Sequence, residues 1–218
     1  MERKEIAIKR SMKLAECEWF GGVYRRIYDI LAIGGRLPPP SEIGVALEVE
    51  GEVPEEARGF ALKDAGVVWF RHIPPTPDDF AHELIHLAEK KRDGEWEEVY
   101  GYNLSQLVAL LAERGIVPRR NPLVLFEEVT LDDLLEAIRK VYRYEFETIE
   151  EYFEFKGVVP SYCYFEPVAT EDRLAVKRKP SVPDEVVLAA SIAEIAAGAL
   201  FDPLDLAVIL ELLGVERS

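Results

Sequence analysis

The chain has 218 residues, of which 49% are hydrophobic and 31% are charged. These values are typical of one compact folded domain, or of a domain with a dependent subdomain, and they exclude disordered and collagen-like classes. The formal net charge of −15 argues against nucleic acid and against anionic membrane surfaces as partners, because both bind basic surfaces.

Hydropathy along the chain predicts a cytoplasmic protein. No uninterrupted apolar stretch follows the charged N-terminus, so no secretory signal is expected. The most apolar region, Val186–Leu213, is interrupted by acidic residues and a proline, so no membrane span is expected either. Cys17 and Cys163 form no CxxC pair and are interpreted as reduced core residues. Side-chain amides are rare while Glu and Arg are plentiful, which indicates a heat-adapted source.

The first hundred residues predict a helix followed by a small sheet. Apolar residues recur every three or four positions over residues 9–33 and favour an amphipathic helix there. Strands are expected at Ile43–Val49, Gly59–Leu62 and Val67–Ile73, the last two joined by a turn at residues 63–66. Three short strands behind one helix predict a small antiparallel or mixed sheet.

The helix with the clearest start and stop signals in the chain is expected over residues 76–94. Thr76 is a suitable N-cap, Pro77 suits the first helical position, and Asp79 stands where a capping-box acid belongs. Gly94 is a natural terminator, and a second helix is expected from about Glu95 to Arg114.

The remaining chain is expected to be mainly helical. Thr130 and Asp133 predict a capping box that opens one long helix to about Phe155. Short strands at residues 162–165 and 174–177 and helices at 184–200 and 203–213 follow. A boundary near residues 116–122 divides the chain into an N-terminal domain, 1–120, and a mainly helical subdomain, 121–218. The C-terminal helices are the expected surface for any oligomer.

The residues that carry chemistry are His82-Glu83-Leu84-Ile85-His86, an HExxH motif inside the predicted helix 76–94. Residues four apart on a helix lie one above the other, so both imidazoles can reach a single ion. A stripe of Phe80, Leu84, Leu87 and Ala88 leaves the two histidines on the opposite side of the helix, facing a cleft. The pattern favours a zinc site over a packed or surface pair of histidines.

With this motif the chain resembles the zincin metallopeptidases over about residues 10–115. The resemblance implies an α+β, zincin-like fold with a backing helix, a small mixed sheet and an HExxH helix. It implies that His82 and His86 bind Zn²⁺ and that Glu83 is the general base of peptide hydrolysis. In that family the edge strand before the helix pairs with an extended peptide, which implies Val67–Ile73 here.

A catalytic zinc site needs a third protein ligand. Position 93 is Asp, so the longer HExxHxxGxxH signature is absent, and the third histidine, His72, lies upstream on a predicted strand. The chain therefore looks most like the gluzincin branch, whose third ligand is a glutamate on the following helix. Glu98 is the favoured ligand because it shares a helical face with Tyr102, Ser105 and Ala109, whereas the opposite face suits a core. The family commonly has Asp or Asn four residues beyond its glutamate ligand, and the Tyr102 of this chain departs from that pattern. The alternatives are Glu97, Glu95, Asn103 or a distal acid, and an acidic first turn also stabilises a helix without any metal.

The sequence thus predicts a zinc-dependent metallopeptidase that acts on a peptide or protein substrate. The alternative is a non-proteolytic protein of zincin fold that binds metal or a protein partner in a regulatory role. An intact Glu83 favours the enzyme, because a metal-binding scaffold needs no general base.

Overall fold

The structure is a computed structural model that describes residues 6–89, 98–169 and 174–215. The fold is mixed α+β and divides into two compact units. Unit 1 comprises the described residues up to Glu89 together with Val108–Val117. Unit 2 comprises the chain from the start of helix α3 (Glu98–Glu113) to Leu107 and from Pro118 onward. The predicted division at residues 120/121 lies close to the passage from Val117 to Pro118, while α3 contributes to both units.

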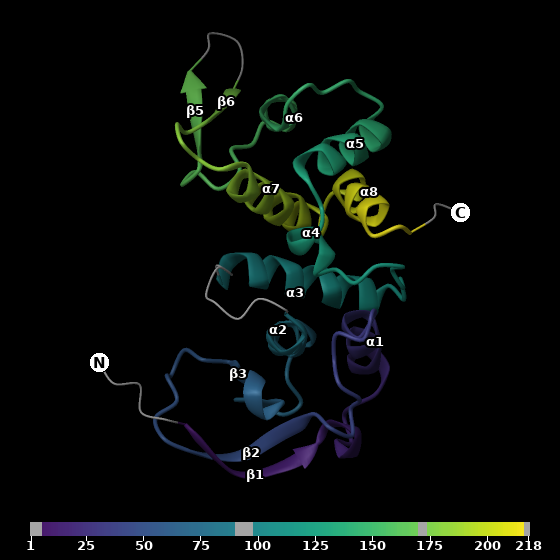
Figure 1. Cartoon of the computed structure of the whole chain (residues 1–218), viewed down its shortest axis with the longest axis vertical. Coiled ribbons are helices and arrows are strands. Elements are labelled where there is room, and N and C mark those ends of the chain that lie inside the picture. The colour runs from purple at the N-terminus through teal and green to yellow at the C-terminus, as the bar shows by residue number, and fades with distance from the viewer. Residues whose placement is uncertain (1–5, 90–97, 170–173, 216–218) are drawn as a thin grey trace. The chain divides into compact units, whose positions relative to one another are not determined.

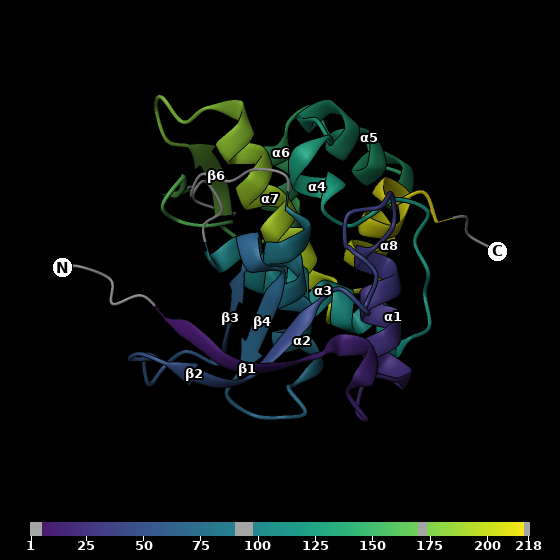
Figure 2. The same cartoon turned by 60° about the horizontal axis from the view of Figure 1, so that its bottom comes forward.

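Unit 1 contains a four-stranded mixed sheet in the order β1-β2-β4-β3. Figure 1 labels β1, β2 and β3, and Figure 2 also labels β4. The strands are β1 (Ala7–Lys13), β2 (Gly44–Glu50), β3 (Gly59–Leu62) and β4 (Val67–Phe70). The central pair, β2 and β4, is parallel, whereas both outer pairs are antiparallel. The predicted strands at 43–49 and 59–62 are confirmed, and the strand predicted at 67–73 ends at Phe70. The predicted turn forms a 3-10 turn, Lys63–Ala65, closed by Gly66 with φ of 62°.

The sheet order corrects the predicted peptide-pairing edge. The strand expected at Val67–Ile73 is β4, which is hydrogen-bonded to β2 on one side and to β3 on the other. Since both its edges are occupied, it cannot take up a further strand. The edge strand next to β4 is β3, whose one neighbour in the sheet, within the part of the chain that the structure describes, is β4. His72 follows β4 in an exposed bend and is not on a strand.

The helix predicted over residues 9–33 is wrong in its first half. Residues Ala7–Lys13 form β1, which pairs with β2, and the helix α1 spans only Gly22–Leu31. Ile8 and Met12 are the two half-buried residues of β1, and pairing with β2 stabilises the extended conformation of this segment. The helical spacing holds from α1 onward, where Ile27 is fully buried.

Helix α2 (Pro77–Ala88) carries the HExxH motif and begins as predicted. The Thr76 hydroxyl oxygen accepts a hydrogen bond from the backbone N–H of Asp79 at 3.2 Å, and Pro77 occupies the first turn. The helix packs against β3, β4 and α1. Helix α3 (Glu98–Glu113) follows and ends before Gly115, whose φ is 68°. The predicted terminator Gly94 lies outside the described residues.

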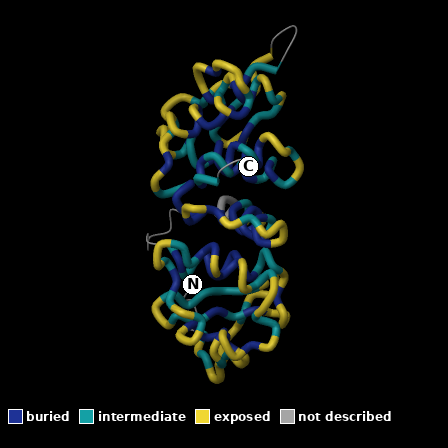
Figure 3. Tube along the Cα trace, turned by 90° about the vertical axis from the view of Figure 1, so that its right-hand side faces the viewer, coloured by how far each residue is buried: buried dark blue, intermediate teal, exposed yellow. Residues whose placement is uncertain are grey.

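Unit 2 is mainly helical and carries a two-stranded sheet. Its elements are α4 (Val124–Glu127), α5 (Leu131–Tyr142), α6 (Ile149–Lys156), β5 (Phe165–Ala169), β6 (Leu174–Arg178), α7 (Asp184–Gly198) and α8 (Pro203–Leu212). Helix α8 packs against α5 and α7, α6 packs against β6, and β5 pairs with β6 in antiparallel fashion. The two final helices are confirmed within two residues of their predicted ends. In both helices the exposed residues lie in the first turn, and buried residues alternate with intermediate ones after it. Figure 3 colours the chain by burial.

The single long helix predicted from Thr130 to Phe155 is two helices. The capping box of Thr130 and Asp133 forms as predicted and opens α5. Arg143 then adopts a left-handed conformation with φ of 55°, which ends the helix, and Thr148 caps the start of α6. The apolar periodicity continues across this break, which explains the wrong prediction. The strand predicted at 162–165 begins only at Phe165, because the preceding residues form a turn.

A buried carboxylate joins four helices of unit 2. Asp205 of α8 is 4% exposed and accepts hydrogen bonds from the hydroxyls of Tyr142 (2.8 Å) and Tyr152 (2.6 Å) and from the ammonium of Lys156 (3.0 Å). A Cβ at Gly198 of α7 would overlap the same carboxylate, so glycine is required there. These contacts place Asp205 in a fully bonded structural network.

The two cysteines are free, and the prediction for Cys163 is wrong. Cys17 is buried, and burial with the nearby Glu16 raises the pKa of its thiol to about 11, whereas Cys163 is exposed. Across residues 6–89, 98–169 and 174–215, no helix is long and apolar enough to cross a bilayer.

Candidate metal centre

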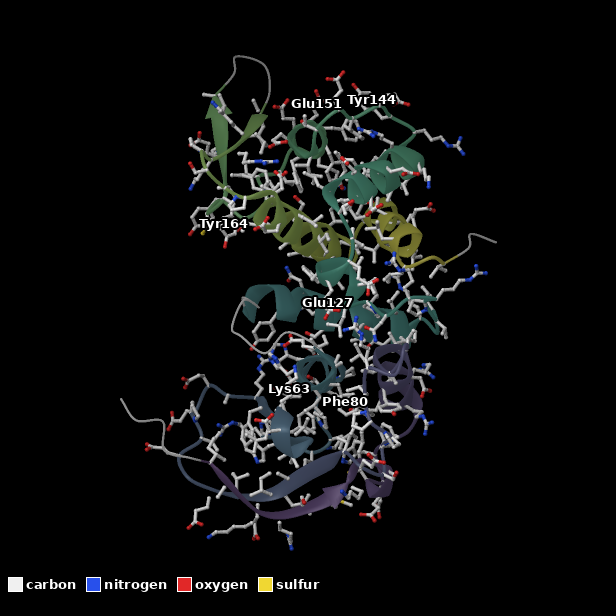
Figure 4. The ribbon with its side chains drawn as sticks, viewed as in Figure 1. Lys63, Phe80, Glu127, Tyr144, Glu151 and Tyr164 are labelled. Carbon is white, nitrogen blue, oxygen red and sulfur yellow. The ribbon has the colours of Figure 1, made fainter. Side chains whose placement is uncertain are left out.

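Helix α2 is fixed at both ends by other parts of unit 1. At its N-terminus, the Tyr24 hydroxyl donates a hydrogen bond of 2.6 Å to the backbone carbonyl of Pro75. At its C-terminus, the Lys63 ammonium donates to the backbone carbonyl of Glu89, where a positive charge favours the helix dipole. Between them Phe80 is fully buried against the rings of Trp19 and Tyr24. Figure 4 labels Phe80, a residue of α2, and Lys63, which lies near that helix.

The two histidines of the motif point their outer nitrogens at one another. Nε2 of His82 lies 3.1 Å from Nε2 of His86, and the ring planes cross at 88°. Two imidazole nitrogens on a tetrahedral zinc ion, each about 2.05 Å from the metal, are about 3.3 Å apart. The pair therefore fits one zinc ion. The same separation also suits a hydrogen bond between two neutral rings, and metal binding distinguishes the two.

The two histidines, His82 and His86, differ in their exposure to solvent. His82 is 7% exposed, whereas the side chain of His86 is 32% exposed. The helix is therefore buried over more of its circumference than the sequence predicts, and the histidine nearer the C-terminal end of α2 is the more open one.

Glu83 lies against the edge strand β3. It is 4% exposed, and a Cβ built at Gly59 would lie 2.6 Å from its Oε1. The register pairs Gly59 with Phe70, a buried residue of β4. Gly59 therefore belongs to the face of the sheet that α2 covers. The motif predicts Glu83 as a site residue, but no local signal predicts its neighbour Gly59.

A second carboxylate, that of Glu89, lies close to the inner nitrogen of His86. Its Oε1 is 3.9 Å from Nδ1 of His86, and its side chain is 9% exposed. This separation is longer than a hydrogen bond, and the contact becomes an ion pair when the ring is protonated. The i, i+3 spacing at the C-terminal end of α2 is the sequence signal that could have identified this pair.

The predicted third ligands fall largely outside what the structure describes. Glu95 and Glu97 lie outside the described residues. Glu98 is the residue at which α3 begins, and its side chain is not described. Asn103 donates a hydrogen bond from Nδ2 to the carbonyl of Ala193 in α7. Among the residues with described side chains, no group of three His, Cys, Asp or Glu side chains that could hold a metal is found.

No family model, no curated protein and no solved structure matches this chain. The interpretation of the site accordingly depends on its own residues and their geometry.

Proposed function

We propose that the chain is a zinc-dependent metallopeptidase of zincin-like fold that cleaves peptides or unfolded proteins. The observation that carries the proposal is the 3.1 Å approach of the two Nε2 atoms of His82 and His86, with Glu83 between them in the sequence. The order of helix α1, strands β2 to β4 of the small mixed sheet and the HExxH helix α2 supports the zincin-like interpretation.

In this proposal His82 and His86 hold the zinc ion, with Glu98 as the third ligand. Zinc in such a site supplies a Lewis acid that polarises the scissile carbonyl and makes water more acidic. Glu83 takes a proton from the attacking water and passes it to the leaving amine. Its burial against β3 restricts the carboxylate to a narrow range of positions, as a general base requires.

The peptide-binding edge in this proposal is β3. Among residues 6–89, 98–169 and 174–215 its one hydrogen-bonded neighbour in the sheet is β4, so in this proposal an extended chain pairs with its other side. Because β3 also contacts α2, a peptide paired there passes beside Glu83.

The test compares wild type with Glu83→Gln and measures cleavage of an unfolded protein with and without added zinc. Gln keeps the size of the side chain and removes its capacity as a base. We expect zinc-dependent cleavage in wild type and none in Glu83→Gln, with the same zinc content in both proteins. Equal cleavage by both proteins would contradict the assigned base.

A wild-type chain that binds zinc but cleaves nothing would support the alternative, a non-proteolytic metal-binding protein of the same fold. The zinc content measured in the same samples separates this result from the loss of the metal site itself.

A further inference from the structure

Gly59 and Glu83 are in closer contact than any side chain at position 59 would allow. The three atoms nearest to a Cβ built at Gly59 all belong to Glu83: Oε1 at 2.6 Å, Cγ at 2.9 Å and Cδ at 3.0 Å. Contacts below 3.0 Å essentially do not occur for real Cβ atoms. Since the clash includes Cγ as well as the carboxylate, relief requires the whole Glu83 side chain to turn or β3 to move away.

The backbone gives no other reason for a glycine at this position. Gly59 does not have the positive φ that favours glycine, so an alanine could adopt its conformation. Ala61, two residues further along β3 and therefore on the same face, already carries a Cβ. The strand as such therefore accepts a methyl group on this face.

From this contact we infer that Gly59 is the positioning residue for the Glu83 carboxylate. The missing side chain at position 59 creates the space in which the Glu83 carboxylate lies against the edge strand β3. The inference rests on the proposed function for the role of Glu83 as the base, while the packing itself can be tested without any activity.

The first measurement is a double-mutant cycle read by urea denaturation. Gly59→Ala is combined with wild-type Glu83, with Glu83→Gln and with Glu83→Ala. We expect Gly59→Ala to lower the urea midpoint when position 83 is Glu or Gln, which have the same length, and to leave the midpoint unchanged when it is Ala. An equal shift in all three chains would overturn the inference, because the cost would then be independent of the Glu83 side chain.

The matched control is Gly44→Ala in β2 of the same sheet. A Cβ at Gly44 would lie 2.8 Å from Cγ2 of Val67 instead of meeting Glu83. Its effect on the urea midpoint should therefore be the same with Glu or Ala at position 83, which shows that the coupling belongs to position 59.

The second measurement is hydrolysis together with zinc content. In Gly59→Ala we expect kcat to fall by about a hundredfold, the loss that a displacement of about 1 Å causes, with KM and zinc content little changed. A Gly59→Ala protein that retains wild-type kcat would overturn the inference. If wild type cleaves nothing, the proposed function fails, and the double-mutant cycle alone decides whether Gly59 positions the Glu83 side chain.

Discussion

Nε2 of His82 and Nε2 of His86 lie 3.1 Å apart, one helical turn from each other on α2. This relationship depends on an intact helix, because the helical conformation brings side chains four residues apart onto one face. The same helix is capped by Thr76 and tied at its far end by Lys63. The proposed metal centre therefore depends on interactions several residues away from it.

Loss of the N-cap of α2 should destabilise unit 1. In Thr76→Ala the backbone N–H of Asp79 loses its acceptor, and the free energy of unfolding should fall by about 1 kcal/mol. Thr76→Ser keeps the hydroxyl and should unfold close to the wild-type midpoint. Urea denaturation measures both, and equal midpoints for Thr76→Ala and Thr76→Ser would contradict the capping role.

Removal of the buried carboxylate of unit 2 should cost far more than removal of a surface one. Asp205→Ala leaves Lys156, whose side chain is 19% exposed, without one of its two carboxylates, and leaves two tyrosine hydroxyls without an acceptor. We expect a loss of roughly 3 kcal/mol in the free energy of unfolding. The control Glu211→Ala removes a partner of the exposed Lys140 and should have a much smaller effect. Similar losses in both variants would contradict this account.

The stability of unit 2 should depend on the ionisation of Glu194. Burial, with the neighbouring Asp205, raises the pKa of Glu194 above its ordinary value of 4.5. The folded state therefore binds this proton more tightly than the unfolded state, and stability falls as the pH rises from 4.5 through the folded-state pKa.

Glu194→Gln removes this ionisation. The variant should be more stable than wild type at about pH 7, and the gain should disappear at about pH 4, where both states are protonated. Urea midpoints measured between these two pH values test this prediction. A gain that stays constant over the whole range would show that Glu194 affects stability by another route.

The fold could be predicted where the determining signals are local. Thr76 and Pro77 mark the start of α2, and Gly66 closes the turn between β3 and β4. The prediction of one helix over residues 9–33 is wrong because apolar residues of β1 and α1 together recur at the spacing of a single helix. The identity of the edge strand was misassigned because strand order depends on pairing between distant segments, which a local pattern does not encode.

The candidate site shows the same division between local and distant information. His82, Glu83 and His86 follow from a motif within one helix turn and a half. Gly59 lies on strand β3, and a glycine in a strand can have several structural reasons. Its connection with Glu83 therefore becomes visible only in the folded structure. The third ligand also depends on how distant segments meet, and the motif alone leaves Glu98, Glu97, Glu95 and Asn103 open.

Replacement of Glu98 should weaken zinc binding. Loss of a side chain that only hydrogen-bonds to a metal ligand already costs about 10- to 100-fold in metal affinity. Loss of a ligand itself should therefore cost at least as much. Glu97→Ala and Glu95→Ala are the matched controls and should bind zinc as wild type does. A competition titration with a zinc chelator measures all three. A larger loss in either control would transfer the third-ligand assignment to that residue.

The most direct test of the central claim is the zinc content of the purified chain after loading and dialysis, measured by elemental analysis. His86→Ala removes one nitrogen of the pair, and His72→Ala is the matched control because His72 lies in an exposed bend. We expect about one zinc per chain in wild type and in His72→Ala, and almost none in His86→Ala. Wild type without zinc, or His86→Ala with as much zinc as wild type, would contradict the proposed metal centre.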